Sequence, residues 1–456
     1  MPNVIRRLPA TLALGGMILS GASGVSRAAT ASITSSGDPF AAPPSAAAPV
    51  APVVAPAKAR LPAPIPVAAP AAAAVAPQTT QPVATTTAAP QPAQDAPVTI
   101  PGAPPPPPLP DVAAYVLMDA QTGTVIAARD AQIPRAPASL TKLMTAYLTY
   151  QAIARGLLKP DQTVPVSTAA WKAGGSRMFI SPNMTVTVDQ LLHGLIIDSG
   201  NDSAVALAEA VGGTQDGFVQ SMNAEAAKLG LSGTHYTNVS GLPDPDLHTT
   251  ALDVAKLSRA IVRDFPQFLQ ISAQKHYTFN GIRQRSWNPV LFRDPSVDGL
   301  KTGLTDAAGH CIDATALRSG TRLIAVELGG PNWSAGTASI EALLDYGYHF
   351  FQDATIATAG KPMGVLADQN VTPDKIDVGP AKDLVLTVPT ESVKSVTSAL
   401  LLGPAPIGAL PKGTQVGTIS YSLGGQVLAT VPAVTLTDTR PAGFVTRMIR
   451  QLRAML

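Results

Sequence analysis

A long proline- and alanine-rich stretch limits what this chain can fold into. From about Ser35 to Pro110 the sequence is mostly Ala, Pro, Val, Thr and Gln, and it holds about half of the chain's 44 prolines. Proline removes backbone donors and alanine offers little apolar surface to bury, so we expect an extended, semi-rigid spacer without a core. Order is expected to begin near Asp111, which leaves enough of the 456 residues for two domains.

The first 28 residues follow the order of a secretory signal. Arg6 and Arg7 precede the apolar run LPATLALGGMIL, and small residues follow it up to Ala28. The run is shorter than the roughly 20 residues that span a bilayer, so we expect export by the general route and removal of residues 1–28. Residues 29–110 then remain as a linker, and either a tether across the cell envelope or an inert insertion fits their composition.

Charge and cysteine content exclude several classes of protein. The net charge of +2 gives no reason to expect a nucleic-acid partner. The single cysteine, Cys311, excludes an internal disulfide and a cysteine-based metal site. His193, His248, His276 and His310 lack the spacing of metal ligands. We therefore expect surface or core roles for these histidines instead of a zinc site.

Residues 111–353 change from strand signals to helix signals and back. The run AAYVLMDAQTGTVIAARD predicts two strands around a turn, and the segments that follow place apolar residues at helical spacing. Strands return at KHYTFN, after VDGLKTG, at CIDATALRSG and at TRLIAVELGG. This order predicts an α+β domain in which helices pack on an antiparallel sheet.

The C-terminal part of the chain has a different residue pattern. Residues 354–440 carry short alternating runs with frequent Gly and Pro, which predict a small β-rich domain. Residues 441–456 contain no acidic side chain and predict an amphipathic helix with three arginines on its polar face. Such a helix can lie in the headgroup region of an anionic bilayer, or it can dock on its own domain. We favour the bilayer. The apolar face comprises Phe444, Val445, Met448, Ile449, Leu452, Met455 and Leu456, and the polar face Arg447, Arg450 and Arg453.

The segment ASLTKLMTAYL places Ser139 three residues before Lys142 at the start of an apolar helical pattern. Positions three apart share a helix face, and apolar neighbours favour a neutral amine that can accept a proton from the hydroxyl. The alternative is an ordinary helix start with a surface lysine. A second copy, Ser272 and Lys275, precedes a strand-like run, which would direct the two side chains to opposite faces.

Two further motifs follow in the chain. Ser199 and Asn201 flank a glycine between two predicted helices, where a turn can direct both side chains into a cleft. Helix capping by Asn201 or Asp202 is the alternative interpretation. The third motif, Lys301-Thr302-Gly303, occurs once.

Ser-x-x-Lys, Ser-x-Asn and Lys-Thr-Gly, in this order, are the signature of serine penicillin-recognising enzymes. The runs GGSRMFISPNMTV, SGNDSAVALAEAVGG and DPSVDGLKTGLTDAAGH resemble those of the D-alanyl-D-alanine carboxypeptidases, the low-molecular-mass penicillin-binding proteins. The resemblance extends from about Asp111 to the C-terminus. It implies a β-lactamase/transpeptidase-like fold, a peptidoglycan stem pentapeptide as substrate and β-lactams as covalent inhibitors. It also implies a periplasmic protein attached peripherally to the outer face of the inner membrane.

The resemblance implies a role for each motif residue in catalysis. Ser139 attacks the carbonyl of the penultimate D-Ala, and Lys142 takes its proton. Ser199 relays a proton to the leaving amine. An acyl-enzyme forms, D-Ala leaves, and water releases the shortened peptide. The resemblance thus implies neither a metal nor a cofactor.

The remaining motif residues are implied to bind substrate. Asn201 holds the substrate amide, Lys301 and Thr302 face the C-terminal carboxylate, and Gly303 lets the strand approach the ligand closely. The backbone N–H groups of Ser139 and Leu304 form the oxyanion hole, which contributes about 3 kcal/mol per donor.

The sequence departs from the family pattern in two places. Relatives can carry histidine after Lys-Thr-Gly, where this chain has Leu304, and some carry a basic side chain in the loop that here reads GGPNWSAG. Carboxylate recognition is then left to Lys301 and Thr302, with Arg283 or Arg285 as candidate helpers.

Three alternatives share these motifs. A β-lactamase of class A would need a glutamate to activate the deacylating water, and the comparable segment SGLPDPDLHTTALDV has no obvious counterpart. A DD-endopeptidase that cuts cross-links has the same signature. A binding protein without activity would have no need for a buried amine.

Overall fold

The computed structural model describes residues 98–403 and 408–455, so the expected signal segment and most of the linker lie outside the described residues. The first domain contains a six-stranded sheet in which all neighbouring strands are antiparallel. In sheet order the strands are β1 (Val98–Thr99), β3 (Val125–Arg129), β2 (Ala114–Asp119), β10 (Thr321–Gly330), β9 (Gly309–Arg318) and β8 (Val297–Thr305).

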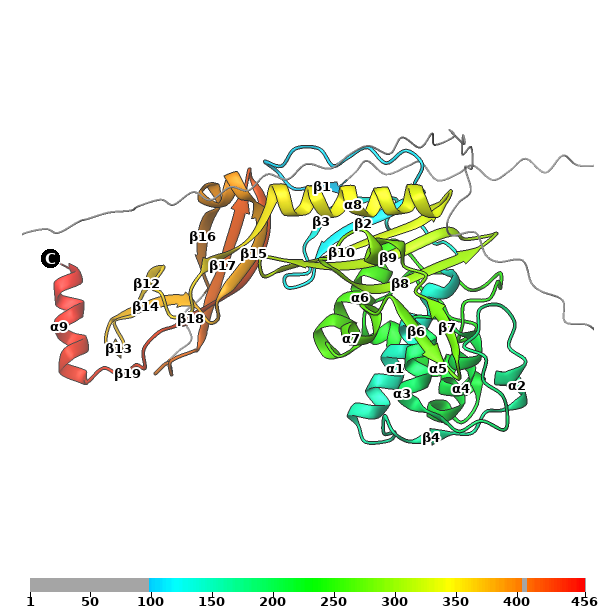
Figure 1. Ribbon diagram of the computed structural model, residues 1–456. Helices are drawn as coiled ribbons and strands as arrows, with labels where there is room; N and C mark the ends of the chain where they lie inside the picture. Colours follow the sequence, from blue (N-terminus) through cyan, green and yellow to red (C-terminus); the bar gives the residue numbers. More distant parts are fainter. Residues whose placement is uncertain (1–97, 404–407, 456) are drawn as a thin grey trace, which may run out of the picture. The chain divides into compact units, whose positions relative to one another are not determined.

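Helices cover both faces of this sheet (Figure 1). α8 (Trp333–Phe350) lies on one face and begins at Asn332, whose side chain accepts from the Ala335 N–H. α6 (Ala251–Asp264) lies on the other face. The predicted α+β class is confirmed, because the central strands bury apolar side chains on both faces and need cover on each.

The remaining helices of this domain form a cluster beside the sheet (Figure 1). Local signals set their ends: a Thr187–Gln190 capping box begins α3, and Gly213, at φ +71°, ends α4. The elements are η1 (Ala138–Thr141), α1 (Lys142–Ala154), α2 (Thr168–Trp171), α3 (Val188–Ile196), α4 (Asn201–Gly212), α5 (Gln215–Lys228), α7 (Phe268–Ser272) and η2 (Pro289–Phe292). Two short strand pairs join them: β4 (Thr163–Val164) with β5 (Val186–Thr187), and β6 (His276–Phe279) with β7 (Ile282–Arg285).

Residues 98–110, which we assigned to the spacer, are part of the folded domain. β1 pairs with β3, and the Arg129 guanidinium donates to the Leu109 carbonyl at 2.6 Å. Ile100 and Leu109 are buried. The expected start of order near Asp111 was therefore wrong. A run of prolines excludes regular hydrogen bonding within the run, but it does not prevent the residues on either side from packing.

The C-terminal residues form a separate β-rich domain, as predicted. It has its own apolar core, which includes Val371, Ile376, Val378, Val388 and Ile419. The central sheet has the order β12 (Gly364–Ala367), β14 (Lys375–Pro380), β18 (Gln426–Thr435), β17 (Gln415–Leu423) and β16 (Thr397–Leu402). β11 (Phe351–Ala357) pairs with β15 (Leu384–Pro389), β13 (Val371–Thr372) pairs with β19 (Arg440–Pro441), and η3 covers Thr390–Ser395.

The described part of the chain ends in α9 (Phe444–Met455). Arg450 fixes this helix to the β-rich domain: its guanidinium donates to the carbonyls of Gln369 and Val371 and lies 3.3 Å from Asp374. The apolar side chains of α9 remain exposed, with exposed fractions of 74% for Phe444, 61% for Val445, 46% for Met448, 45% for Ile449 and 55% for Leu452. Within residues 98–403 and 408–455, no helix combines the length and apolarity needed to cross a bilayer.

The packing of residues 98–110 leads to a stability test. We expect a chain that starts at Asp111 to have a free energy of unfolding at least about 3 kcal/mol below that of a chain that starts at Val98. Two buried apolar side chains, each contributing about 1.5–3 kcal/mol, are lost together with β1. Urea unfolding of the two shortened proteins measures the difference, and equal midpoints would restore the boundary at 110.

Candidate active site

Ser139 and Lys142 lie on one face of the turn that begins the first long helix. Ser139 is in the 3-10 turn η1, and Lys142 is the first residue of α1. The sequence predicted an α-helical turn here, whereas the observed turn is of the tighter 3-10 type. Side chains three apart eclipse one another in a 3-10 turn. The Lys142 Nζ consequently lies 2.9 Å from the Ser139 Oγ, and it donates to the Ser240 carbonyl at 2.7 Å.

The Lys142 amine is almost completely removed from water, with an exposed fraction of 1%. Burial lowers the pKa of Lys142 well below its ordinary value, the nearby charge of Lys301 lowers it further, and Asp202 partly opposes this. An amine in this setting loses its proton readily, as a base that activates a hydroxyl must.

The second motif lies between α3 and α4. Ser199 adopts a left-handed backbone conformation, with φ +59°, and its Oγ accepts from the Lys301 Nζ at 2.9 Å. Lys301 also donates to the Thr302 carbonyl at 3.0 Å and has an exposed fraction of 2%. Burial lowers the pKa of Lys301 to about 7, and the carboxyl of Asp198 acts in the opposite direction.

Asn201 does not cap the helix that it begins. α4 has no side-chain cap, and the Asn201 amide donates to the Gly174 carbonyl at 2.6 Å. The carboxylate of Asp202 accepts from the backbone N–H groups of Met178, Phe179 and Ile180. Both side chains thus hold the segment that forms one wall of the cleft. Asn201 is not a helix cap, whereas Asp202 also accepts from the Ser203 N–H in the first turn of α4.

The third motif lies within β8, which begins at Val297, earlier than the sequence pattern indicated. Gly303 is needed where β8 passes the turn that carries Ser139. A Cβ on Gly303 would lie 3.0 Å from the Pro137 carbonyl oxygen and 3.0 Å from the Ser139 backbone nitrogen. Only glycine allows this approach without displacing one of the two segments.

These segments enclose a cavity of about 110 Å³ beside Ser139. Of the predicted site residues, Ser139, Ser199, Thr302, Gly303 and Leu304 line it. Lys142 and Lys301 lie behind the two serine hydroxyls, and Asn201 does not line the cavity. Three lining residues had not been predicted: Ser176, Trp287 and Trp333. No local sequence pattern marks them, although Ser176 belongs to a run noted as family-like and Trp333 to the loop noted as a departure from the family pattern.

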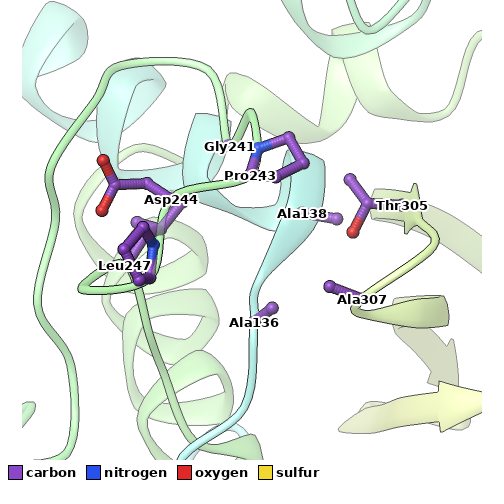
Figure 2. Close-up of a pocket in the computed structure, with 9 residues that line it drawn as sticks. Ala136, Ala138, Gly241, Pro243, Asp244, Leu247, Thr305 and Ala307 are labelled. Atoms are coloured by element: carbon purple, nitrogen blue, oxygen red, sulfur yellow. The ribbon is translucent and has the colours of Figure 1, made fainter. Parts of the chain in front are cut away.

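A second, mainly apolar cavity of about 270 Å³ adjoins the same turn (Figure 2). It lies between the loop that carries Gly241, Pro243 and Leu247 and the end of β8 at Thr305. Ala138, which also lines it, directly precedes Ser139. The Asp244 carboxylate, at this cavity, accepts a hydrogen bond from the Asp246 backbone N–H at 2.9 Å.

The second Ser-x-x-Lys copy and the two candidate helper arginines lie outside this site. The hydroxyl of Ser272, which ends α7 and is not on a strand, donates to the Asp298 carbonyl at 2.6 Å, so it does not pair with Lys275. Neither Arg283 nor Arg285 lines the cavity, and the Arg285 guanidinium lies 3.9 Å from the centre of the Phe292 ring. In the described ranges, no group of three or more His, Cys, Asp or Glu side chains is arranged to hold a metal.

The fold and the two Lys–Ser pairs define a penicillin-recognising serine enzyme, and comparison with known proteins identifies its family. Residues 104–332 match the D-alanyl-D-alanine carboxypeptidase family, and residues 351–440 match the C-terminal domain of penicillin-binding protein 5. The chain is 35% identical to D-alanyl-D-alanine carboxypeptidase DacA of Escherichia coli (strain K12), over 76% of this chain and 88% of the relative.

Solved structures agree with this result. Penicillin-binding protein 5 from Haemophilus influenzae is 33% identical, with a TM-score of 0.68, over 73% of this chain and 99% of that structure. Penicillin-binding protein 6B from Escherichia coli is 34% identical, with a TM-score of 0.62, over 73% and 98%. The chain belongs to the D-alanyl-D-alanine carboxypeptidase family of low-molecular-mass penicillin-binding proteins, and it is a serine-type hydrolase.

Gly241 offers a test of how closely the loop must approach Ser139. Its φ is +88°, and a Cβ there would lie 1.8 Å from the Ala138 carbonyl oxygen. We expect Gly241→Ala to slow acylation by penicillin about 100-fold, because displacement of the turn by about 1 Å misplaces Ser139. Rapid-quench labelling measures the rate.

Gly281 provides the matched control. It has a φ of +77°, and no atom lies within 4 Å of its Cβ position. Gly281→Ala should lose about 1–2 kcal/mol of stability from the left-handed conformation alone and should acylate at the rate of the unaltered protein. Similar acylation by both variants would show that the close approach is not needed.

Proposed function

We propose that this enzyme removes the terminal D-Ala from peptidoglycan stem pentapeptides through an acyl-enzyme on Ser139. The observation that carries the proposal is the 2.9 Å contact between the buried Lys142 Nζ and the Ser139 Oγ. The neutral amine takes the hydroxyl proton as the Oγ attacks the carbonyl carbon of the penultimate D-Ala. Backbone N–H groups of Ser139 and Leu304 stabilise the oxyanion.

Collapse of the tetrahedral intermediate breaks the peptide C–N bond. The leaving amine takes the proton that Lys142 removed from Ser139, relayed through Ser199, so Lys142 is neutral again. Lys301 and Thr302 hold the terminal carboxylate until D-Ala departs. Lys142 then accepts a proton from a water molecule as that water attacks the ester. Cleavage of the ester restores the Ser139 hydroxyl.

A β-lactam amide opens by the same attack, but its amine stays attached to the acyl group and hinders the approach of water.

This mechanism assigns unequal roles to the two Ser-x-x-Lys copies. We expect Ser139→Ala to abolish both D-Ala release from a model pentapeptide and covalent labelling by penicillin, because the attacking oxygen is gone. Lys142→Gln should lower acylation by about 10²–10⁴-fold, the usual contribution of a positioned base. Ser272→Ala, which removes a structural hydrogen bond, should keep both activities. Peptide mapping of the labelled protein locates the ester.

The same assay separates the alternatives. Release of D-Ala by Ser139→Ala would contradict the proposed mechanism. Turnover of penicillin within seconds would indicate a β-lactamase, and preferential cleavage of cross-linked dimers over pentapeptide would indicate an endopeptidase. Absence of D-Ala release by the unaltered protein would indicate a binding protein.

We also propose that the enzyme works in the periplasm, peripherally attached to the outer face of the inner membrane. Residues 1–28 would direct export, residues 29–97 would remain as a tether, and α9 (within residues 441–456) would bind the anionic surface. The exposed apolar side chains of α9 support this proposal, since its contact with the β-rich domain is made by Arg450 instead.

We expect deletion of residues 441–456 to release the protein from membranes without loss of D-Ala release. A finer variant, Leu452→Asp, should weaken sedimentation with vesicles of anionic lipid at least tenfold. Leu401→Asp is the control, because Leu401 is exposed on β16, with a fraction of 72%, outside the helix. Unchanged fractionation would contradict attachment through α9. Intact mass of the recovered protein reports whether residues 1–28 have been removed.

A further inference from the structure

Asp198 directly precedes Ser199, and its carboxyl is buried without a hydrogen bond. Its exposed fraction is 1%, and neither oxygen has a partner among the described residues. Burial raises the pKa of Asp198 to about 7, with a further contribution from the charge of Asp202. An unpaired buried carboxyl destabilises a protein unless its charge is balanced, and the mechanism above does not use this one.

Four buried ionisable groups interact electrostatically here: Asp198 with Asp202 and Lys301, and Lys142 with Lys301 and Asp202. The other carboxyl, Asp202, is fully engaged with the backbone N–H groups of four residues. The amine of Lys142 is held by Ser139 and Ser240. Among the described residues, the Lys301 amine donates only to the Ser199 hydroxyl and the Thr302 carbonyl, and neither carries a charge. Asp198 is therefore the carboxyl left to balance Lys301.

We propose that Asp198 is a positioning residue for Lys301: its negative charge keeps the Lys301 amine protonated on the Ser199 hydroxyl, ready to receive the terminal carboxylate of the substrate. The inference rests on the proposed function, because it concerns the group that binds this carboxylate. Burial lowers the pKa of Lys301, and the Asp198 charge is what raises it. Without Asp198 the amine would lose its proton at lower pH.

Three other titratable groups interact with Asp198 or Lys301, and none of them should produce the same pH dependence. Tyr277, on β6, has a pKa of about 12, raised by burial and by Asp198, so it stays neutral at physiological pH. Asp202, on α4, acts on Asp198 and on Lys142. Lys142 is needed without its proton and sets the acid limb of the activity profile, whereas Lys301 is needed with its proton and sets the alkaline limb. The two lysines therefore affect opposite sides of the pH profile.

The test is the pH dependence of Asp198→Asn, measured as kcat/KM for a peptide ending in D-Ala-D-Ala and as the rate of penicillin acylation between pH 5 and 10. We expect the alkaline limb to move down by about one pH unit, the low end of the effect of an opposite charge at close range. At pH 8 the KM should rise about tenfold, and kcat should change less. The acid limb should stay in place.

Glu327→Gln is the matched control. Glu327 is also a buried carboxyl without a hydrogen-bond partner among the described residues, and its pKa is raised by burial to about 8, but it lies on β10, which β9 separates from β8. This variant should keep the wild-type alkaline limb. If Asp198→Asn does not fold, Asp198→Leu serves in its place with the same expected shift.

The outcomes separate the two proposals. An unaltered protein that neither reacts with penicillin nor releases D-Ala overturns the proposed function. If the unaltered protein is active and Asp198→Asn keeps its alkaline limb, or if Glu327→Gln shifts that limb equally, only the role of Asp198 is overturned.

Discussion

The removal of two lysine amines from water is the constraint on which the active site depends. Lys142 and Lys301 are almost fully buried, and each is held on a serine hydroxyl. Desolvation favours the neutral form of both amines, yet the proposed mechanism needs one base and one cation. Their surroundings differ: the charge of Lys301 lowers the pKa of Lys142 further, with Asp202 acting against it, whereas the charge of Asp198 raises the pKa of Lys301. Pushing two pKa values apart by their environments is a general way to obtain acid and base roles at one pH.

Bringing these groups together requires backbone conformations that most residues avoid. Ser199 and Ala138 both have positive φ, and Gly303 and Gly241 pass the turn of Ser139 at distances that exclude a Cβ. Such conformations persist only where the surrounding structure determines them. Here the determinants include β8 on one side and the 241–247 loop on the other. The strained turn is thus a consequence of packing three separated segments around one nucleophile.

Because the site is built from separated segments, only its local contacts could be predicted from the sequence. The spacing of Ser139 and Lys142 is local, so their contact followed from a helical turn, although the turn is 3-10 in type. The contact between Lys301 and Ser199 joins segments far apart in the chain and was not predicted from the sequence. Only the family resemblance placed both residues in one site. Trp287 and Trp333 were missed because tertiary packing alone brings them to the cavity. The boundary near Asp111 failed for a similar reason, since the strand partner of β1 lies further along the chain.

The C-terminal helix poses a separate physical question, because its contact with the folded protein is polar. A helix as short as α9 is marginal in water unless its apolar face is covered. Arg450 is engaged by two carbonyls and Asp374, which leaves the apolar side chains in solvent. The alternative of docking on the domain would have predicted the opposite arrangement, with those side chains buried and the arginines free. The exposed apolar face of α9 would be covered if the helix lay at a bilayer interface, as we propose.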